Sequence, residues 1–168
     1  MTKIIGVILI ISSASMYGFK MSGELKIHCD ELLEIKKIMF LLRGEIEYSL
    51  CPIKEALINV SDRCSDKFKK IIRSISEQNE GTFSENWKNE WEKGFKTLLL
   101  TEDELKDIID LNEGMGLRDK DSQIKQLDLY LSKLDMSIDS LKEVYPKKCR
   151  IYKCLSVGFG IFLSIIII

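Results

Sequence analysis

Few residues in this sequence have the type and spacing that chemistry would need. His28 is the only histidine among 168 residues, which excludes a metal site with several histidine ligands. It falls on an apolar heptad position of a predicted helix, which favours a partly buried, hydrogen-bonded histidine over a general base. Gly114-Met115-Gly116 lacks the rest of either glycine-rich phosphate-binding motif and follows a predicted helix, not a strand. We therefore interpret this tripeptide as a helix stop.

The carboxylates and the two tryptophans show no catalytic arrangement either. Aspartates and glutamates alternate with lysines at helical spacings, which is typical of a solvated helix face. Trp87 and Trp91 stand four residues apart, a spacing that predicts core residues in preference to a ligand-binding aromatic pair. The sequence thus predicts no catalytic residue, no metal ligand and no cofactor, and we expect that the protein is not an enzyme.

The cysteines indicate a reducing compartment. There are five of them, an odd number that a secreted disulfide framework would not leave, and none is in a CxxC or other metal-binding spacing. We therefore expect reduced thiols in a cytoplasmic domain. The residues are Cys29, Cys51, Cys64, Cys149 and Cys154.

Charge is strongly segregated along the chain. All 26 acidic residues lie between Glu24 and Glu143, with 19 of the 25 basic ones, so this middle stretch has a net charge of −7. An acidic middle would not follow a phosphate backbone, and we expect no nucleic-acid partner. The other six basic residues flank the apolar ends of the chain: Lys3, Lys20, Lys147, Lys148, Arg150 and Lys153.

Each end of the chain carries an apolar segment. Residues 4–19 and 154–168 are uncharged runs of sixteen and fifteen residues. A helix of that length spans roughly 22–24 Å, less than the ~30 Å of a bilayer's hydrocarbon core. Flanking lysines can reach the interface and the bilayer can thin locally, at modest cost. We predict a short transmembrane helix at each end, in contact with the lipid bilayer.

The first apolar segment has a second interpretation, a cleaved signal peptide. Lys3 precedes the apolar run, and the small residues Ser13-Ala14-Ser15 follow within it. The basic cluster in residues 147–153 favours an uncleaved anchor. It lies on the domain side of the second run, and excess basic charge marks the cytoplasmic face of a membrane.

The middle of the chain predicts amphipathic helices. In residues 24–50 apolar side chains recur every seven residues, with further ones between them at four-three spacing. Pro52 ends this helix and suits the first turn of the next, because proline lacks an N–H group. Capping-box patterns begin at Thr82 and Thr101. The predicted helices are residues 24–50, 52–62, one from Ser65 to before Gly81, one after Thr82, one after Thr101 that ends at Gly114-Met115-Gly116, and 119–145.

The predicted fold class is all-α, an antiparallel bundle of about six helices with a short transmembrane helix at each end. Residues 1–20 form the N-terminal transmembrane segment in this prediction, and residues 21–146 form a cytoplasmic helical bundle. Residues 147–168 form the basic flank and the C-terminal transmembrane segment.

Two motifs resemble the stage III sporulation protein AB family of endospore-forming bacteria. Residues 42–57 resemble the family's Leu-Glu-x-Glu-Ile-x-Tyr…Pro-Leu-x-Glu-Ala-Leu signature. Residues 115–123 resemble its Leu-Gly-x-Ser-Asp-x-x-x-Gln opening of the last long helix, with departures at Met115 and Arg118. The resemblance covers nearly the whole chain, including both apolar ends. The matches in the first motif are Leu42, Glu45, Ile46, Tyr48, Pro52, Glu55, Ala56 and Leu57.

The resemblance implies a fold similar to the cytoplasmic domain of the inner-membrane platform protein of type II secretion systems. It also implies a structural adaptor in the complex that connects mother cell and forespore. The chain would lie in the outer forespore membrane with its bundle in the mother-cell cytoplasm. There it would dock a secretion-type ATPase to other membrane subunits, and an oligomer is left open. An unrelated anchored signalling or scaffold protein is the alternative.

The helix corner that carries the first motif supplies the candidate partner-binding residues. We expect Tyr48 to pack near this corner, where its hydroxyl needs a partner if it is buried. Acidic side chains around the corner are the candidates for contact with a basic partner. The candidates are Glu45, Glu47, Tyr48, Pro52 and Glu55.

Overall fold

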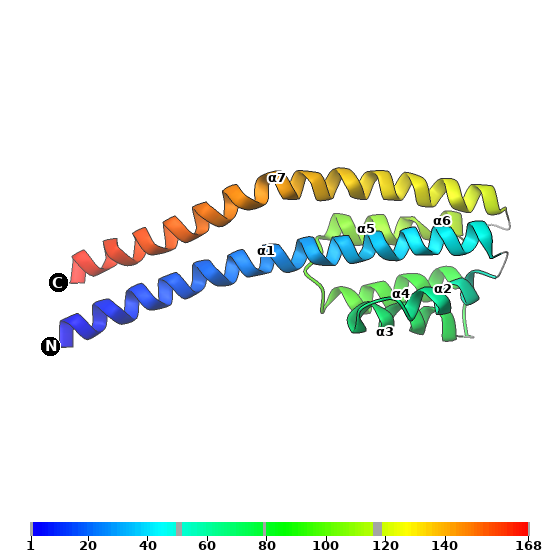
Figure 1. Cartoon of the computed structure of the whole chain (residues 1–168). Helices are drawn as coiled ribbons and strands as arrows, with labels where there is room; N and C mark the ends of the chain where they lie inside the picture. The colour runs from blue at the N-terminus through cyan, green and yellow to red at the C-terminus, as the bar shows by residue number, and fades with distance from the viewer. Residues whose placement is uncertain (1, 50–51, 79, 116–118, 168) are drawn as a thin grey trace. The chain divides into compact units, whose positions relative to one another are not determined.

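The computed structural model describes residues 2–49, 52–78, 80–115 and 119–167, and every regular element in these ranges is an α-helix (Figure 1). The predicted all-α class is therefore confirmed. The helices are α1 (Thr2–Tyr48), α2 (Ile53–Ser61), α3 (Asp66–Glu77), α4 (Phe83–Phe95), α5 (Glu102–Asp110), α6 (Asn112–Met115) and α7 (Lys120–Ile167).

The chain divides into two compact units. One comprises Met1–Cys29 and Asp139–Ile168, and the other comprises Asp30–Ile138. Helices α1 and α7 contribute to both units, whereas α2 to α6 belong to the second unit alone. We call this second unit the helical bundle. Within it, Lys36 pairs with Asp135 and Arg43 pairs with Asp128, so α1 and α7 run antiparallel.

Both long helices are longer than predicted. α1 is continuous from Thr2 to Tyr48, so no break separates the apolar run from the amphipathic helix. The predicted end of the last helix at Tyr145 is wrong, because α7 continues through Pro146 to Ile167. A proline inside a helix removes one hydrogen bond and bends the axis without necessarily ending it.

The interior of the bundle is built on the predicted apolar positions. Trp87 and Trp91 on α4 are completely buried, which confirms that they are core residues. Their ring centroids lie 6.0 Å apart, and Phe68 of α3 lies 6.3 Å from Trp91. Full burial of a phenylalanine side chain such as that of Phe68 contributes about 1.5–3 kcal/mol. The heptad of α1 is also buried, at Leu32, Ile35, Met39, Leu42 and Ile46, whereas its Phe40 is exposed.

Both predicted capping boxes are present. The Thr82 hydroxyl accepts a hydrogen bond from the Glu85 amide, and the Glu85 carboxylate accepts one from the Thr82 amide, at 3.2 and 2.9 Å. Thr101 and Glu104 form the same reciprocal pair at the start of α5. Gly81, which precedes the first box, has φ of +78° and thus provides the predicted break between α3 and α4.

The predicted end of the helix after Thr101 is also wrong. Helix α5 ends at Asp110, four residues before the predicted glycine stop, and Asn112–Met115 form the separate turn of helix α6. Met115 is almost completely buried, so the segment is held by its apolar side chain. Gly116 lies outside the described residues.

The apolar ends belong to the unit of Met1–Cys29 and Asp139–Ile168. Among the residues placed in the structure, no helix has a stretch with the length and hydrophobicity that crossing a membrane requires. The predicted transmembrane helices therefore rest on the sequence alone. Most side chains of the two apolar runs lie outside the described residues.

Candidate partner-binding site

The predicted corner joins α1 to α2 at Pro52. This residue is the N-cap of α2 with φ of −57° and ψ of 146°, as expected for a proline that begins a helix. Its carbonyl accepts hydrogen bonds from the Glu55 and Ala56 amides at 2.9 and 3.1 Å. Pro52 and Glu55 are both exposed, and Glu55 lies in the first turn of α2, where the helix dipole favours an acidic side chain.

Tyr48 does not pack at the corner as predicted, because 80 % of its surface is exposed. It is the last residue of α1, two positions after the buried Ile46. Successive helical residues turn by about 100°, so Tyr48 points away from the interior that Ile46 enters. Its ring and hydroxyl are thus available to another molecule.

Two of the predicted carboxylates are engaged within the bundle. Glu45 accepts hydrogen bonds from the Ser49 hydroxyl at 3.0 Å and from the Asn59 amide at 3.2 Å, which ties α1 to α2. Glu47 pairs with Arg43 at 2.5 Å. Two of the three predicted carboxylates at the corner therefore already have partners within the bundle.

Arg43 extends this network to α7. Its Nε donates to the Asp128 carboxylate at 2.5 Å, and this hydrogen bond raises the pKa of Arg43. Lys120, at the start of α7, donates to the carbonyl of Glu47 near the C-terminus of α1. A cation there complements the negative end of the helix dipole. Arg43 and Lys120 join the end of α1 to α7.

The predicted membrane-flanking basic residues all belong to the unit with the apolar ends. Lys20 pairs with Glu24 at 3.7 Å, and both side chains are well exposed. Lys147, Lys148 and Arg150 are exposed on α7. The side chains of Lys3 and Lys153 lie outside the described residues.

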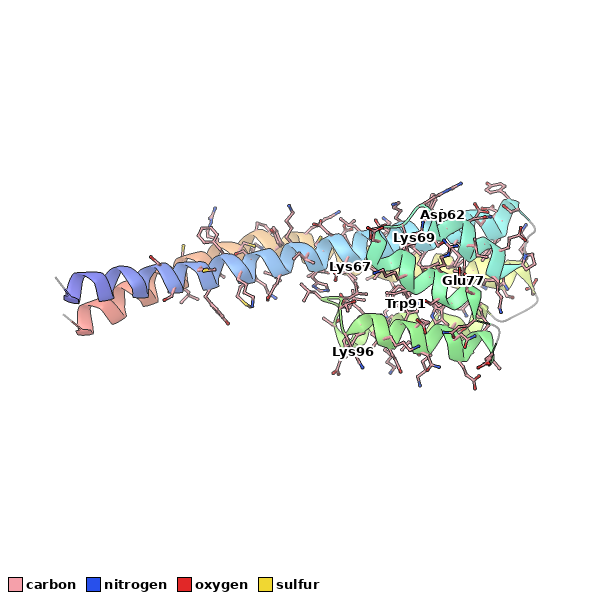
Figure 2. The ribbon with its side chains drawn as sticks, turned by 90° about the horizontal axis from the view of Figure 1, so that it is seen from below. Asp62, Lys67, Lys69, Glu77, Trp91 and Lys96 are labelled. Atoms are coloured by element: carbon pink, nitrogen blue, oxygen red, sulfur yellow. The ribbon has the colours of Figure 1, made fainter. Side chains whose placement is uncertain are left out.

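A buried carboxylate that sequence reasoning missed links three parts of the bundle. Glu31 of α1 is 5 % exposed, and it accepts hydrogen bonds from Lys67 of α3 at 3.1 Å and from the Leu99 amide at 2.6 Å. Figure 2 shows Lys67 on the same part of the bundle as Trp91. The sequence held one signal for this buried contact, namely a charged side chain, Glu31, on the apolar heptad face of α1. Its pairing indicates a structural role, since a buried charge must be compensated.

The cysteines and the histidine occupy ordinary structural positions. His28 is half-buried, as predicted. The Cys64 thiol donates to the Val60 carbonyl at 3.1 Å, and burial, together with the nearby Glu34, raises its pKa to about 11. Cys51 lies outside the described residues. Over the described ranges, no group of three or more histidine, cysteine, aspartate or glutamate side chains could hold a metal ion.

A second surface, which the sequence interpretation did not single out, lies between α5 and α7. Asp107 pairs across it with Lys133 at 2.5 Å. Asp103, Asp107 and Asp110 recur at four- and three-residue intervals, which places them on one side of α5. That spacing was visible in the sequence as an acidic stripe. We call the hollow between α5 and α7, with its acidic edge, the α5–α7 groove.

The described residues thus form a non-repetitive helical bundle in which ion pairs such as Lys36–Asp135 and Arg43–Asp128 join helices. The family model described as "Stage III sporulation protein AB" matches residues 3–168. The chain therefore belongs to the stage III sporulation protein AB family. Its function is accordingly related to sporulation.

Individual relatives agree with this assignment. The chain is 23 % identical over 171 residues to stage III sporulation protein AB of Bacillus subtilis strain 168, with 99 % of each protein covered. A solved structure of stage III sporulation protein AB superposes with a TM-score of 0.65 at 20 % identity, over 71 % of this chain and 97 % of that one. At this identity the structural match shows the fold alone.

Proposed function

We propose that this chain is a membrane-anchored adaptor subunit of the secretion-like channel complex that links mother cell and forespore during endospore formation. In this proposal it has no catalytic activity and docks a cytoplasmic ATPase to membrane components of the complex. Family membership over residues 3–168 carries the proposal, because the match includes the bundle and both apolar ends. An unrelated membrane-anchored scaffold or signalling protein is the alternative, and the same match disfavours it.

The bundle's construction supports a role in contact rather than in chemistry. Its largest aromatic side chains, Trp87, Trp91 and Phe68, are completely or almost completely buried. Its buried carboxylates Glu31 and Glu90 are held by lysines, Lys67 and Lys93, at 3.1 and 2.5 Å. These groups hold helices in place, which leaves the exterior as the surface on which partners bind.

The proposed membrane attachment uses the two apolar runs. Both belong to one compact unit, so one bilayer can receive both ends of the chain. The basic residues Lys147, Lys148 and Arg150 are exposed beside the second run, where they favour the cytoplasmic side of a membrane. We infer that the membrane is the outer forespore membrane and that the bundle faces the mother-cell cytoplasm.

Deletion and purification from sporulating cells test this proposal. Loss of the chain should block spore formation after engulfment, and the tagged chain should co-purify with an ATPase and with membrane subunits. The co-purification should weaken at high salt, since the middle stretch is acidic. Normal spore formation without the chain, or expression in vegetative cells alone, would show that the adaptor assignment is wrong and favour the alternative.

A further inference from the structure

The α5–α7 groove has a polar edge with a net negative charge and an apolar floor. Two adjoining hollows share Asp107, Asp110 and Lys133. The ionisable residues around them include four acids and two lysines, and one of those lysines is already paired with Asp107. The acids are Asp103, Glu104, Asp107 and Asp110, and the lysines are Lys106 and Lys133.

Two of these acids have no partner within the bundle. Asp103 and Asp110 are exposed and form no ion pair or hydrogen bond with the described residues. The corner at Pro52 differs, because its Glu45 and Glu47 are engaged by Asn59 and Arg43. The four acids outnumber Lys106 and Lys133 by two, so the edge of the groove offers net negative charge to another molecule.

The floor of the groove is apolar and carries one hydroxyl that has no partner within the described bundle. Leu129 is 69 % exposed on α7, beside the buried Leu111 and Tyr130. Tyr130 is only 8 % exposed, and its hydroxyl has no hydrogen-bond partner among the described residues. Burial, with Asp107 and Glu104 nearby, raises the pKa of Tyr130, so the hydroxyl stays protonated as a donor. A buried phenol normally finds an acceptor.

We propose that the α5–α7 groove binds a basic amphipathic helix of another protein. The inference rests on the proposed adaptor role and names the face on which a partner docks. Lysines or arginines of such a helix pair with Asp103 and Asp110, and its apolar stripe covers Leu129. Its polar edge supplies an acceptor to Tyr130.

The shape of the groove favours a protein helix over a small molecule. Its two hollows have volumes of about 180 and 590 Å³, and both lie open at the surface between α5 and α7. A pocket of roughly 300–1,000 Å³ that binds a small molecule encloses most of its ligand, which an open groove does not. The acidic stripe also extends over two turns of α5, from Asp103 to Asp110, which matches the repeat of a second helix.

The first test measures the binding of two probe peptides to the full chain in phosphatidylcholine nanodiscs, after subtraction of binding to empty nanodiscs. One probe is a fluorescent amphipathic helix with a leucine stripe and lysine flanks. The other has the same sequence with every lysine replaced by glutamate. The groove should bind the lysine probe and reject the glutamate probe. Equal binding of both probes would overturn the proposal.

Charge reversal then locates the binding. The double variant Asp103→Lys, Asp110→Lys should weaken the lysine probe about tenfold, because two attractions become repulsions. Leu129→Gln should weaken it several-fold, and Tyr130→Phe a few-fold. The matched control is Asp66→Lys, Glu80→Lys, which makes the same charge change at exposed positions outside the groove, with Asp66 also in a first helical turn. An equal loss in this control would overturn the groove as the binding site.

Cross-linking in cells tests what kind of partner occupies the groove, and the deletion results separate the groove assignment from the adaptor role. Cross-linking from position 129 in sporulating cells should yield an adduct with a basic segment of a different protein, and an adduct with a second copy of this chain would overturn the inference. If deletion of the chain blocks spore formation but the Asp103→Lys, Asp110→Lys variant binds the probe normally, the adaptor role stands and the groove assignment is wrong. If deletion has no effect while the groove discriminates between the probes, only the adaptor role is wrong.

Discussion

The corner at Pro52 and the α5–α7 groove are both acidic, but the fold uses their charges differently. At the corner, the Glu45 carboxylate accepts a hydrogen bond from Asn59 of α2, and the Glu47 carboxylate accepts one from Arg43 of its own helix, so both are engaged within the bundle. In the groove, Asp103 and Asp110 remain exposed and unpaired within the described structure. A cluster of like charges becomes a candidate contact surface only where the fold leaves the charges uncompensated.

This difference also decides which charge-reversal substitutions can test the docking of a partner at the corner. Reversal of Glu45 or Glu47 removes an intramolecular contact and would confound docking with stability. Glu55 is exposed, with no side-chain hydrogen bond or ion pair in the described structure, so Glu55→Lys is the informative change at the corner.

The largest effect is expected at the interior that supports both surfaces. Trp91→Ala removes a completely buried side chain between α3 and α4 and should lower the free energy of unfolding by about 3–5 kcal/mol. Chemical denaturation measures this, and both surfaces should be lost together. Trp91→Phe is the control, with a smaller loss, because it keeps a ring and removes an indole N–H that has no acceptor in the described structure. Equal stability of Trp91→Ala and wild type would contradict the packing.

A smaller loss of stability is expected when Arg43, which links the corner to α7, is replaced. Arg43→Gln should lower the thermal midpoint by a few degrees, because Arg43 bridges Glu47 of α1 and Asp128 of α7. Arg73→Gln is the matched control. Arg73 pairs at 2.6 Å with Glu77 of its own helix, so its loss leaves the helix contacts intact and should change the midpoint little. Equal effects of the two changes would show that the bridge to α7 is not structural.

These contrasts mark what the sequence alone could predict. The capping boxes at Thr82 and Thr101 were predictable because their partners are three residues away. The two buried tryptophans followed from helical spacing. The bond between Arg43 and Asp128 joins residues 85 positions apart, so no local pattern contains it.

The ends of the long helices were less predictable for a different reason. Gly23 in α1 and Pro146 in α7 are both helix-breaking residue types, with costs of about 1 and 3 kcal/mol inside a helix. Packing can outweigh such costs, and local propensity cannot show whether it does. The same limit applies to Tyr48, whose exposure depends on where α1 ends relative to the interior.

The next prediction concerns the rate at which Cys64 reacts with thiol reagents. This rate decides whether labelling of Cys64 can show on which side of the membrane the bundle lies. Since burial raises the Cys64 pKa to about 11, its thiol is protonated at neutral pH and should react slowly with maleimides. A cysteine at the exposed Ser132 should react much faster. The ratio of the two rates should narrow only above pH ~8.5, where the exposed thiol is already ionised while the thiolate fraction of Cys64 still grows with each pH unit.

For the same reason the folded state should lose stability above pH ~8.5, where an unfolded thiol ionises before the folded one. Stopped-flow labelling of the purified chain measures the two rates. Fast labelling of Cys64 at neutral pH would contradict its burial. If Ser132→Cys is labelled in intact cells by an impermeant maleimide, with lysed cells as the accessible control, the proposed cytoplasmic location of the bundle is wrong.

The smallest effect on stability is expected at Tyr48, and it separates contact from packing at the corner. Tyr48→Phe removes only a hydroxyl from a side chain that is 80 % exposed, so the free energy of unfolding should change by less than about 0.5 kcal/mol. If the corner is a contact surface, the same variant should weaken co-purification with the complex, and Glu55→Lys should weaken it further, both with unchanged thermal midpoints.

Phe40→Ser provides the matched change at an exposed aromatic on another part of α1, and it should leave co-purification intact. A clear drop in the midpoint of Tyr48→Phe would show that the hydroxyl is bonded within the bundle. Normal assembly of both corner variants would leave the α5–α7 groove as the acidic surface to which docking is assigned.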